Sequence, residues 1–316
     1  MTGDLMGPTR SFGLLLALVS ALTFSTSGPF AHALLDAGWT APAAVAARVG
    51  IAALVLAVPT AIALRGRWGA VRRDLTGIAL FGVLGVGAAQ VGFFNAIRYL
   101  PVGVALLLEY LGVVLVVFWM WAAHGQRPRT LTTAGAVTAV VGLVLVLDLS
   151  GGAGLSLVGV AWGLFAGVGL ASYFVLGARD SQQGEVPALA LATAGMAIGA
   201  VVLLVLGATG LLPMHATFGQ VTLGDQRMSW LVPVAGLSLV AAVVAYVTGI
   251  AAARALGARL SSFVGLTEVL FAVLVSWLVL DELPTAVQIA GGALIVAGVA
   301  LVRLDERRPA EALASA

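Results

Sequence analysis

The feature that most constrains this chain is a series of long apolar runs that continues through almost the whole sequence. A helix of about 20 apolar residues crosses the ~30 Å hydrocarbon core of a bilayer. We find ten such runs, separated by arginine, proline, glycine or acidic residues, and predict ten transmembrane helices. Their approximate ranges are 11–35, 42–64, 75–98, 102–124, 132–148, 157–177, 187–212, 229–253, 258–280 and 286–304.

The composition excludes the main alternatives to a membrane protein. Of the 316 residues 61% are hydrophobic and 9% are charged, which leaves too little polar surface to cover a soluble globule. The same apolar content excludes disorder, and the 40 glycines lack the Gly-X-Y period of collagen. The strands of a membrane β-barrel would be shorter and alternating. We therefore expect an all-α membrane protein.

The two halves of the chain resemble each other at an offset of 156 residues, without a gap. Each half carries five predicted helices, and an odd number of crossings gives the two copies opposite orientations. We expect inverted five-helix repeats at 11–148 and 157–304, a design that places the substrate site near mid-membrane. The residues paired by the offset include Arg98 with Arg254, Trp121 with Trp277, Pro128 with Pro284, Gly135 with Gly291 and Gly142 with Gly298.

The arginines predict the orientation of the chain. Thirteen of the sixteen fall in segments that are cytoplasmic if the N-terminus is inside, against two, Arg98 and Arg227, outside. The positive-inside rule then predicts a protein of the cytoplasmic membrane, with cytoplasmic tails at 1–10 and 305–316. The sequence Ala31-His32-Ala33 also fits a signal-peptide cleavage site. Cleavage would remove half of a helix that the repeat requires, so we expect this helix to be retained.

Three ionisable residues lie inside the predicted spans: Arg48, Glu109 and Glu268. A charge at the centre of a membrane helix costs at least roughly 2.5–3.5 kcal/mol, which makes each residue a functional candidate. Glu109 would hold a substrate amine or a coupling proton, or make a structural hydrogen bond. Glu268 lies on a stripe of small and polar residues that lines a cavity or packs against another helix. Arg48 would bind a substrate carboxylate, snorkel to the interface or brace a neighbouring helix.

Uncharged side chains add further candidates. Ser25 lies in a hydroxyl-rich interruption at 23–29, where Pro29 predicts a kink, and its hydroxyl would serve a ligand or its own helix. Gln90 and Asn95 are candidates to line a pore from the third helix. Three aromatic residues would either stack on an organic substrate or pack in the core; these are Trp162, Tyr173 and Tyr246.

No motif indicates an enzyme or a cofactor. The chain has no cysteine and its three histidines are isolated, so we expect no metal site. Its glycine-rich stretches lie inside predicted spans, which argues against a phosphate-binding loop and ATP-driven transport. The pI near 9.5 favours contact with lipid headgroups over nucleic acid in a membrane protein.

In the second half, the stretch Leu266-Thr267-Glu268-Val269-Leu270-Phe271-Ala272 places a glutamate before a hydrophobic segment. It resembles the Glu-Pro-hydrophobic motif of the EamA family of the drug/metabolite transporter superfamily, with Val269 in place of the proline. The resemblance to this family extends over about residues 11–304. Asp281-Glu282-Leu283 and Gly291 resemble its closing acidic turn and glycine-rich last helix. In the first half, residues 101–112 and 172–177 are similar to the threonine/homoserine exporter branch.

This resemblance implies a basket of ten helices that works by alternating access, with Glu109, Tyr173, Tyr246 and Glu268 near a central cavity. We therefore expect a secondary transporter that exports a small polar metabolite such as an amino acid or an amine, with proton coupling as a further hypothesis. A lipid-linked or nucleotide-sugar flippase is an alternative, which would need a basic cavity that only Arg48 supports. An intramembrane enzyme or a non-transporting subunit is another.

Overall fold

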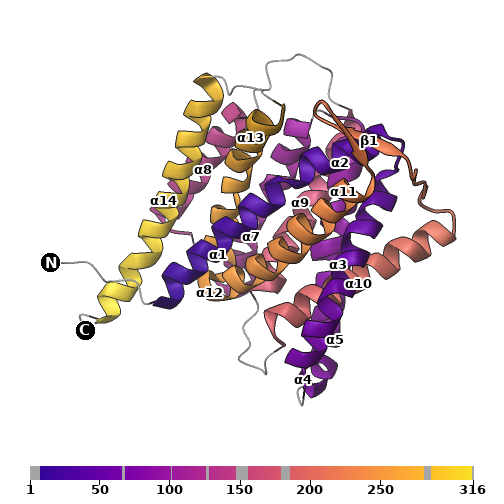
Figure 1. The fold of residues 1–316 in the computed structure, drawn as a ribbon. Coiled ribbons are helices and arrows are strands. Elements are labelled where there is room, and N and C mark those ends of the chain that lie inside the picture. The colour runs from indigo at the N-terminus through magenta and orange to yellow at the C-terminus, as the bar shows by residue number, and fades with distance from the viewer. Residues whose placement is uncertain are drawn as a thin grey trace.

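The computed structural model of this chain describes residues 8–65, 68–100, 102–125, 128–146, 156–178, 186–280 and 286–314. These residues are helical apart from short connections and one β-hairpin (Figure 1). Among them, six helical stretches are long and apolar enough to cross a membrane, and three further apolar stretches are shorter. The chain is therefore a multi-pass, largely helical membrane protein, while the count of ten spans stays a prediction.

Each of the ten predicted runs is largely helical where the structure describes it, apart from short breaks and run ends. The elements of the first half are α1 Pro8–Ser25, α2 Ser27–Asp36, α3 Ala41–Ala63, α4 Trp68–Arg73, α5 Leu75–Leu80, η1 Phe81–Ala88, α6 Ala89–Ala96, α7 Val102–His124 and α8 Thr130–Val146. Those of the second half are α9 Leu157–Gly177, α10 Ala188–Ala208, β1 Gln220–Leu223, β2 Gln226–Ser229, α11 Leu231–Ala235, η4 Gly236–Val244, α12 Ala245–Gly265, α13 Thr267–Leu280 and α14 Ala286–Ala314.

Two features differ from the sequence prediction. The segment 213–228, which lies between two predicted runs, contains the antiparallel hairpin β1–β2, in which Leu223 pairs with Gln226. Gly224 makes the two-residue turn possible, because its φ of 58° is a conformation that glycine adopts without strain. At the other end of the chain, α14 continues to Ala314, beyond the expected helix end at 304.

The helices are interrupted at defined points. The predicted break in the first run lies at Thr26, between α1 and α2, where neighbouring hydroxyls bond back to carbonyls of their own helix. The expected boundary between 253 and 258 is at Gly257, whose φ of 81° breaks α12. A further break at Leu266, between α12 and α13, was not predicted from the sequence.

Two π-helical stretches occupy matching places in the two halves. Moving η1 by the repeat offset of 156 residues gives 237–244, which lies within η4 (Gly236–Val244). A π-helix is uncommon and is often found at a functional site, because its wider turn alters which backbone groups are hydrogen-bonded within the helix.

Close helix contacts hold the assembly together. In Figure 1, α8 and α14 lie together along one edge, α3 and α10 lie at the opposite edge, and α1 runs beside α12 between them. At the α8–α14 contact, a Cβ on Gly142 would lie 2.6 Å from the carbonyl oxygen of Gly291, so the two backbones touch. Small residues permit such contacts, which supply much of the packing energy between helices in lipid.

Candidate functional site

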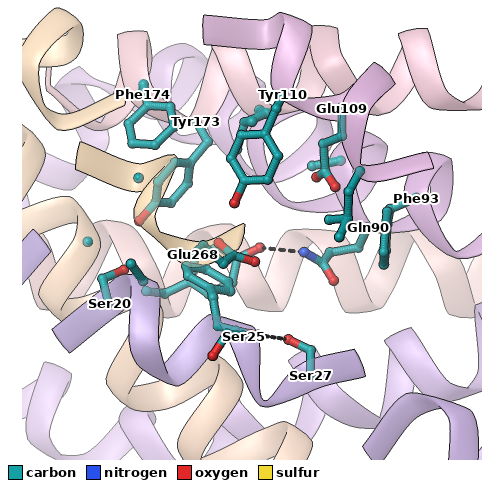
Figure 2. Close-up of a pocket in the computed structure, with 18 of the residues that line it drawn as sticks. Ser20, Ser25, Ser27, Gln90, Phe93, Glu109, Tyr110, Tyr173, Phe174 and Glu268 are labelled. Carbon is teal, nitrogen blue, oxygen red and sulfur yellow. Dashed lines mark hydrogen bonds between the residues drawn. The ribbon is translucent and has the colours of Figure 1, made fainter. Parts of the chain in front are cut away.

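A cavity of about 110 Å³ lies between α1, α6, α7, α9, α12 and α13 (Figure 2). A buried water needs roughly 10–15 Å³ of such space, so the cavity holds several waters or one small metabolite. Seven of the nine candidate residues from the sequence line it. They are Ser25, Arg48, Gln90, Glu109, Tyr173, Tyr246 and Glu268.

Arg48 reaches this cavity from α3 and is fully in the protein interior, with 2% of its surface exposed. Its Nη1 donates a hydrogen bond to Oε1 of Gln90 at 2.8 Å, and its Nη2 donates to the carbonyl oxygen of Ala241 in η4. The side chain therefore braces neighbouring helices and does not snorkel to the interface. Its guanidinium carbon also lies 5.7 Å from the centre of the Phe24 ring, a cation–π distance.

The two carboxylates have different surroundings. None of the described residues donates a hydrogen bond to Glu109, which projects from α7. Glu268, in the first turn of α13, interacts with the side chain of Tyr110. Both carboxylates interact electrostatically with Arg48 across the cavity. The cavity therefore holds one basic and two acidic groups in an apolar setting, where charge interactions are stronger than in water.

Aromatic rings form one wall of the cavity. The rings of Tyr173 and Tyr246 meet edge to face with centroids 5.5 Å apart, and Phe24 contacts both at 6.3 and 5.1 Å. The hydroxyl of Tyr246 also accepts a long hydrogen bond of 3.5 Å from Nε2 of Gln90. Such a wall binds the apolar part of an organic molecule and stabilises a cation through the ring faces.

The hydroxyl-rich break at 23–29 supplies fewer free hydroxyl groups to the cavity than its composition indicates. Ser25 lines the cavity, yet its Oγ donates to the carbonyl oxygen of Leu22 at 2.7 Å. Ser27 likewise donates to the carbonyl oxygen of Phe24. These hydroxyls therefore satisfy their own helix in this conformation.

Two of the candidate residues do not line the cavity. Trp162 is half-buried on α9 and packs edge to face on Phe165. Asn95 is buried on α6, where its amide donates to the carbonyl oxygen of Val91 at 2.8 Å. Both side chains have local partners.

The sequence prediction missed several lining residues, including Ser20, Phe24 and Tyr110. Ser20 and Phe24 are four residues apart on α1 and so share one helix face, a spacing that was visible in the sequence. Tyr110 directly follows Glu109, and Figure 2 shows both side chains directed from α7 towards the cavity. Within the described residues, no cluster of three or more His, Asp or Glu side chains could hold a metal ion.

Two known proteins are similar to this chain over most of its length. A curated "uncharacterized transporter" of Archaeoglobus fulgidus is 29% identical over 227 residues, which cover 72% of this chain and 75% of that protein. A solved structure, described as the crystal structure of a protein, matches 95% of this chain and 99% of its own with a TM-score of 0.74. At 21% sequence identity, this match shows a shared fold alone.

The match to a family covers most of the sequence. Residues 11–148 and 157–304 each match the family described as EamA-like transporters. The chain therefore belongs to the EamA-like transporter family.

Proposed function

We propose that this protein is a secondary transporter that exports an amino acid or an amine across the cytoplasmic membrane, with the central cavity as its substrate site. The observation that carries the proposal is the combination of two carboxylates with an aromatic wall inside a membrane-spanning fold. Carboxylates attract an ammonium group, and aromatic rings accept the rest of a small organic molecule. Among the described residues, Arg48 is the only basic one that lines the cavity, which disfavours a flippase for phosphate-bearing lipids or nucleotide sugars.

Helix contacts support an alternating-access mechanism by inverted repeats. Gly135 of α8 meets Gly298 of α14, and Gly142 meets Gly291, so these helices run antiparallel. The repeat offset of 156 residues relates Gly135 to Gly291 and Gly142 to Gly298, so it maps the first contact onto the second. This is expected if a two-fold axis relates two halves of opposite orientation.

Further contacts follow the same symmetry. The stretch η1 packs on α10 and η4 packs on α3, so each π-helical stretch contacts the second helix of the opposite half. Gln90 and Tyr246, which are hydrogen-bonded to each other, are also separated by the offset of 156 residues. A pair at the interface of two inverted halves lies where rocking of one half against the other would change the cavity.

Contacts at the two ends of the helices support the pairing of helix ends on common sides that the arginine-based topology predicts. Near the predicted outer side, Trp39 donates to the carbonyl oxygen of Thr217 at 2.7 Å, which ties the end of α2 to the segment before the hairpin. Near the predicted inner side, Arg254 donates to the carbonyl oxygen of Val186 at 2.6 Å. The start of α1 and the end of α14 also lie on the same side of the molecule (Figure 1). We propose that this side is cytoplasmic.

Glu109 and Glu268 have different surroundings, so we propose a different role for each. Glu109, which has no described donor, holds the substrate ammonium. Glu268, which has Tyr110 beside it, carries a coupling proton. A carboxylate that moves between protonated and ionised forms gains from a neighbouring hydroxyl, because the hydroxyl can donate to one form and accept from the other.

The experiment uses purified protein in liposomes and compares two assays. Counterflow of radiolabelled threonine, followed by a panel of amino acids and amines, reports substrate exchange without net proton movement. Accumulation driven by a pH gradient reports coupling. Glu109→Gln should lose both, whereas Glu268→Gln should keep counterflow and lose gradient-driven accumulation. Asp225→Asn, in the exposed turn of the hairpin, is the matched carboxylate control and should resemble the unmodified protein.

The outcomes separate the parts of the proposal. Saturable counterflow that is unaffected by Glu109→Gln removes this residue from the substrate site. Gradient-driven accumulation that persists in Glu268→Gln refutes its coupling role. Failure of all compounds to exchange argues against amino acid and amine transport.

A further inference from the structure

Two buried polar atoms at the cavity lack a hydrogen-bond partner among the described residues: Nε of Arg48 and the hydroxyl oxygen of Tyr173. Most buried polar side-chain atoms in folded proteins have a partner, so an orphaned donor requires a physical explanation. Both residues line the cavity, so a ligand bound there can supply the missing partner.

The positive charge of Arg48 is met at close range only by neutral groups of the described residues. Its hydrogen bonds go to an amide oxygen of Gln90 and a backbone carbonyl of Ala241, and its π contact is with Phe24. The carboxylates of the cavity act on it from a longer range. A buried guanidinium is most stable when a hydrogen-bonded anion compensates its charge, and these contacts do not provide one.

The remaining donors of Arg48 suit a carboxylate. Guanidinium offers five N–H groups in a planar fork, and a carboxylate is bound best by two parallel N–H groups on one edge. Gln90 lies in the first half of the chain and Ala241 in the second, so the two bonds fix the guanidinium from both sides. The Nε–H group has no such partner, so it remains available to a carboxylate oxygen.

We propose that Arg48 binds the carboxylate of the substrate through its Nε edge, so that the transporter selects zwitterionic amino acids over amines with the same side chain. The inference rests on the proposed function, in which Glu109 holds the ammonium. A zwitterion supplies one group of each sign and leaves the net charge of the cavity unchanged. An amine leaves Arg48 without a hydrogen-bonded anion. An N-acylated acid leaves Glu109 without a cation bound to it. In either case a buried charge is poorly compensated, which lowers affinity.

The first test needs no variant. Counterflow of radiolabelled phenylalanine into liposomes is competed with unlabelled phenylalanine, its methyl ester, phenethylamine and N-acetylphenylalanine. Sites that hydrogen-bond a polar group strongly reject an analogue that lacks it, so each analogue should compete at least about tenfold more weakly than phenylalanine. Equal competition by the ester or the amine overturns the role of Arg48 and leaves amine transport intact. Absence of saturable exchange with radiolabelled phenylalanine, threonine and phenethylamine alike counts against the proposed function itself.

The second test assigns the selectivity to Arg48. In Arg48→Gln, which removes the guanidinium, the preference for the amino acid over its methyl ester should fall towards one. Arg48→Lys keeps the charge without the planar fork and should show an intermediate preference. Arg227→Gln, at an exposed arginine of the hairpin, is the matched control and should keep the full preference. A full preference in folded Arg48→Gln overturns the inference, and the analogue panel on unmodified protein decides the matter if neither Arg48 variant folds.

Discussion

Replacement of Gly142 by alanine should separate α8 from α14 at the point where their backbones touch. A Cβ at this position would lie 2.6 Å from the carbonyl oxygen of Gly291 and 2.8 Å from the amide nitrogen of Ile295. Contacts of a Cβ become ordinary at 3.4 Å, so the helices must move apart by about 0.8 Å. Both obstructing groups are backbone atoms, which cannot rotate away as a flexible side chain would.

The expected cost follows from this displacement. A radial gap of about 0.5–1 Å forfeits a quarter to a half of the dispersion energy between facing atoms, and overpacking of this kind typically costs about 1–3 kcal/mol. In domains of roughly 150–250 residues, each 1 kcal/mol lowers the unfolding midpoint by about 2–4 °C. We therefore expect Gly142→Ala to lower the midpoint by several degrees, measured by size-exclusion chromatography of detergent-solubilised protein after heating.

A matched control separates the steric effect from the change of residue type. A Cβ on Gly50, a helical glycine of α3, would lie 3.7 Å from the Cβ of Ala200, which is ordinary contact. Gly50→Ala should therefore be neutral or stabilising, by up to about 1 kcal/mol, because alanine is the better helix former. Equal midpoints for Gly142→Ala and Gly50→Ala would refute the reasoning that backbone contact at α8–α14 limits stability.

Two further predictions concern the cavity and the orientation. Gln90→Leu removes the acceptor of Arg48 Nη1 and should destabilise the protein by about 1.5–3 kcal/mol in the same heating assay, since a buried charged donor loses its partner; an unchanged midpoint would show that this bond contributes nothing. The chain has no cysteine, so single cysteines can be introduced without background. In intact cells, a membrane-impermeant maleimide should label Asp225→Cys and should label Arg65→Cys only after permeabilisation; the opposite pattern would invert the proposed topology.

The helical segments and their interruptions were largely predictable from the sequence. The apolar runs matched helices, the hydroxyl-rich stretch at 23–29 matched a break at Thr26, and the gap between 253 and 258 matched the break at Gly257. These features depend on local chemistry, because glycine and proline change the backbone wherever they occur. The break at Leu266 follows Gly265, the last residue of α12, but glycine is too frequent in this chain to mark a break by itself.

The candidate site was predictable in part. Glu109, Glu268 and Arg48 were found because charge inside an apolar span is costly and therefore informative wherever it occurs. Trp162 and Asn95 were selected by residue type alone, and the structure gives both of them local partners away from the cavity. The type of a residue indicates which interactions its side chain can make. The rotation of its helix decides whether that side chain faces the cavity.

The sequence by itself determined that this chain forms membrane helices in two related halves. Apolar runs must lie in lipid or in the protein core, and a backbone without water must form its hydrogen bonds within the helix. Only the tertiary structure decided that Arg48 meets Gln90 and Ala241, and that Tyr110 lies beside Glu268. The physical reason is that lipid and protein interior are about equally apolar. The pattern of hydrophobic residues therefore does not fix which face of a helix turns inward, and that choice is made by the fit of side chains and glycines between helices.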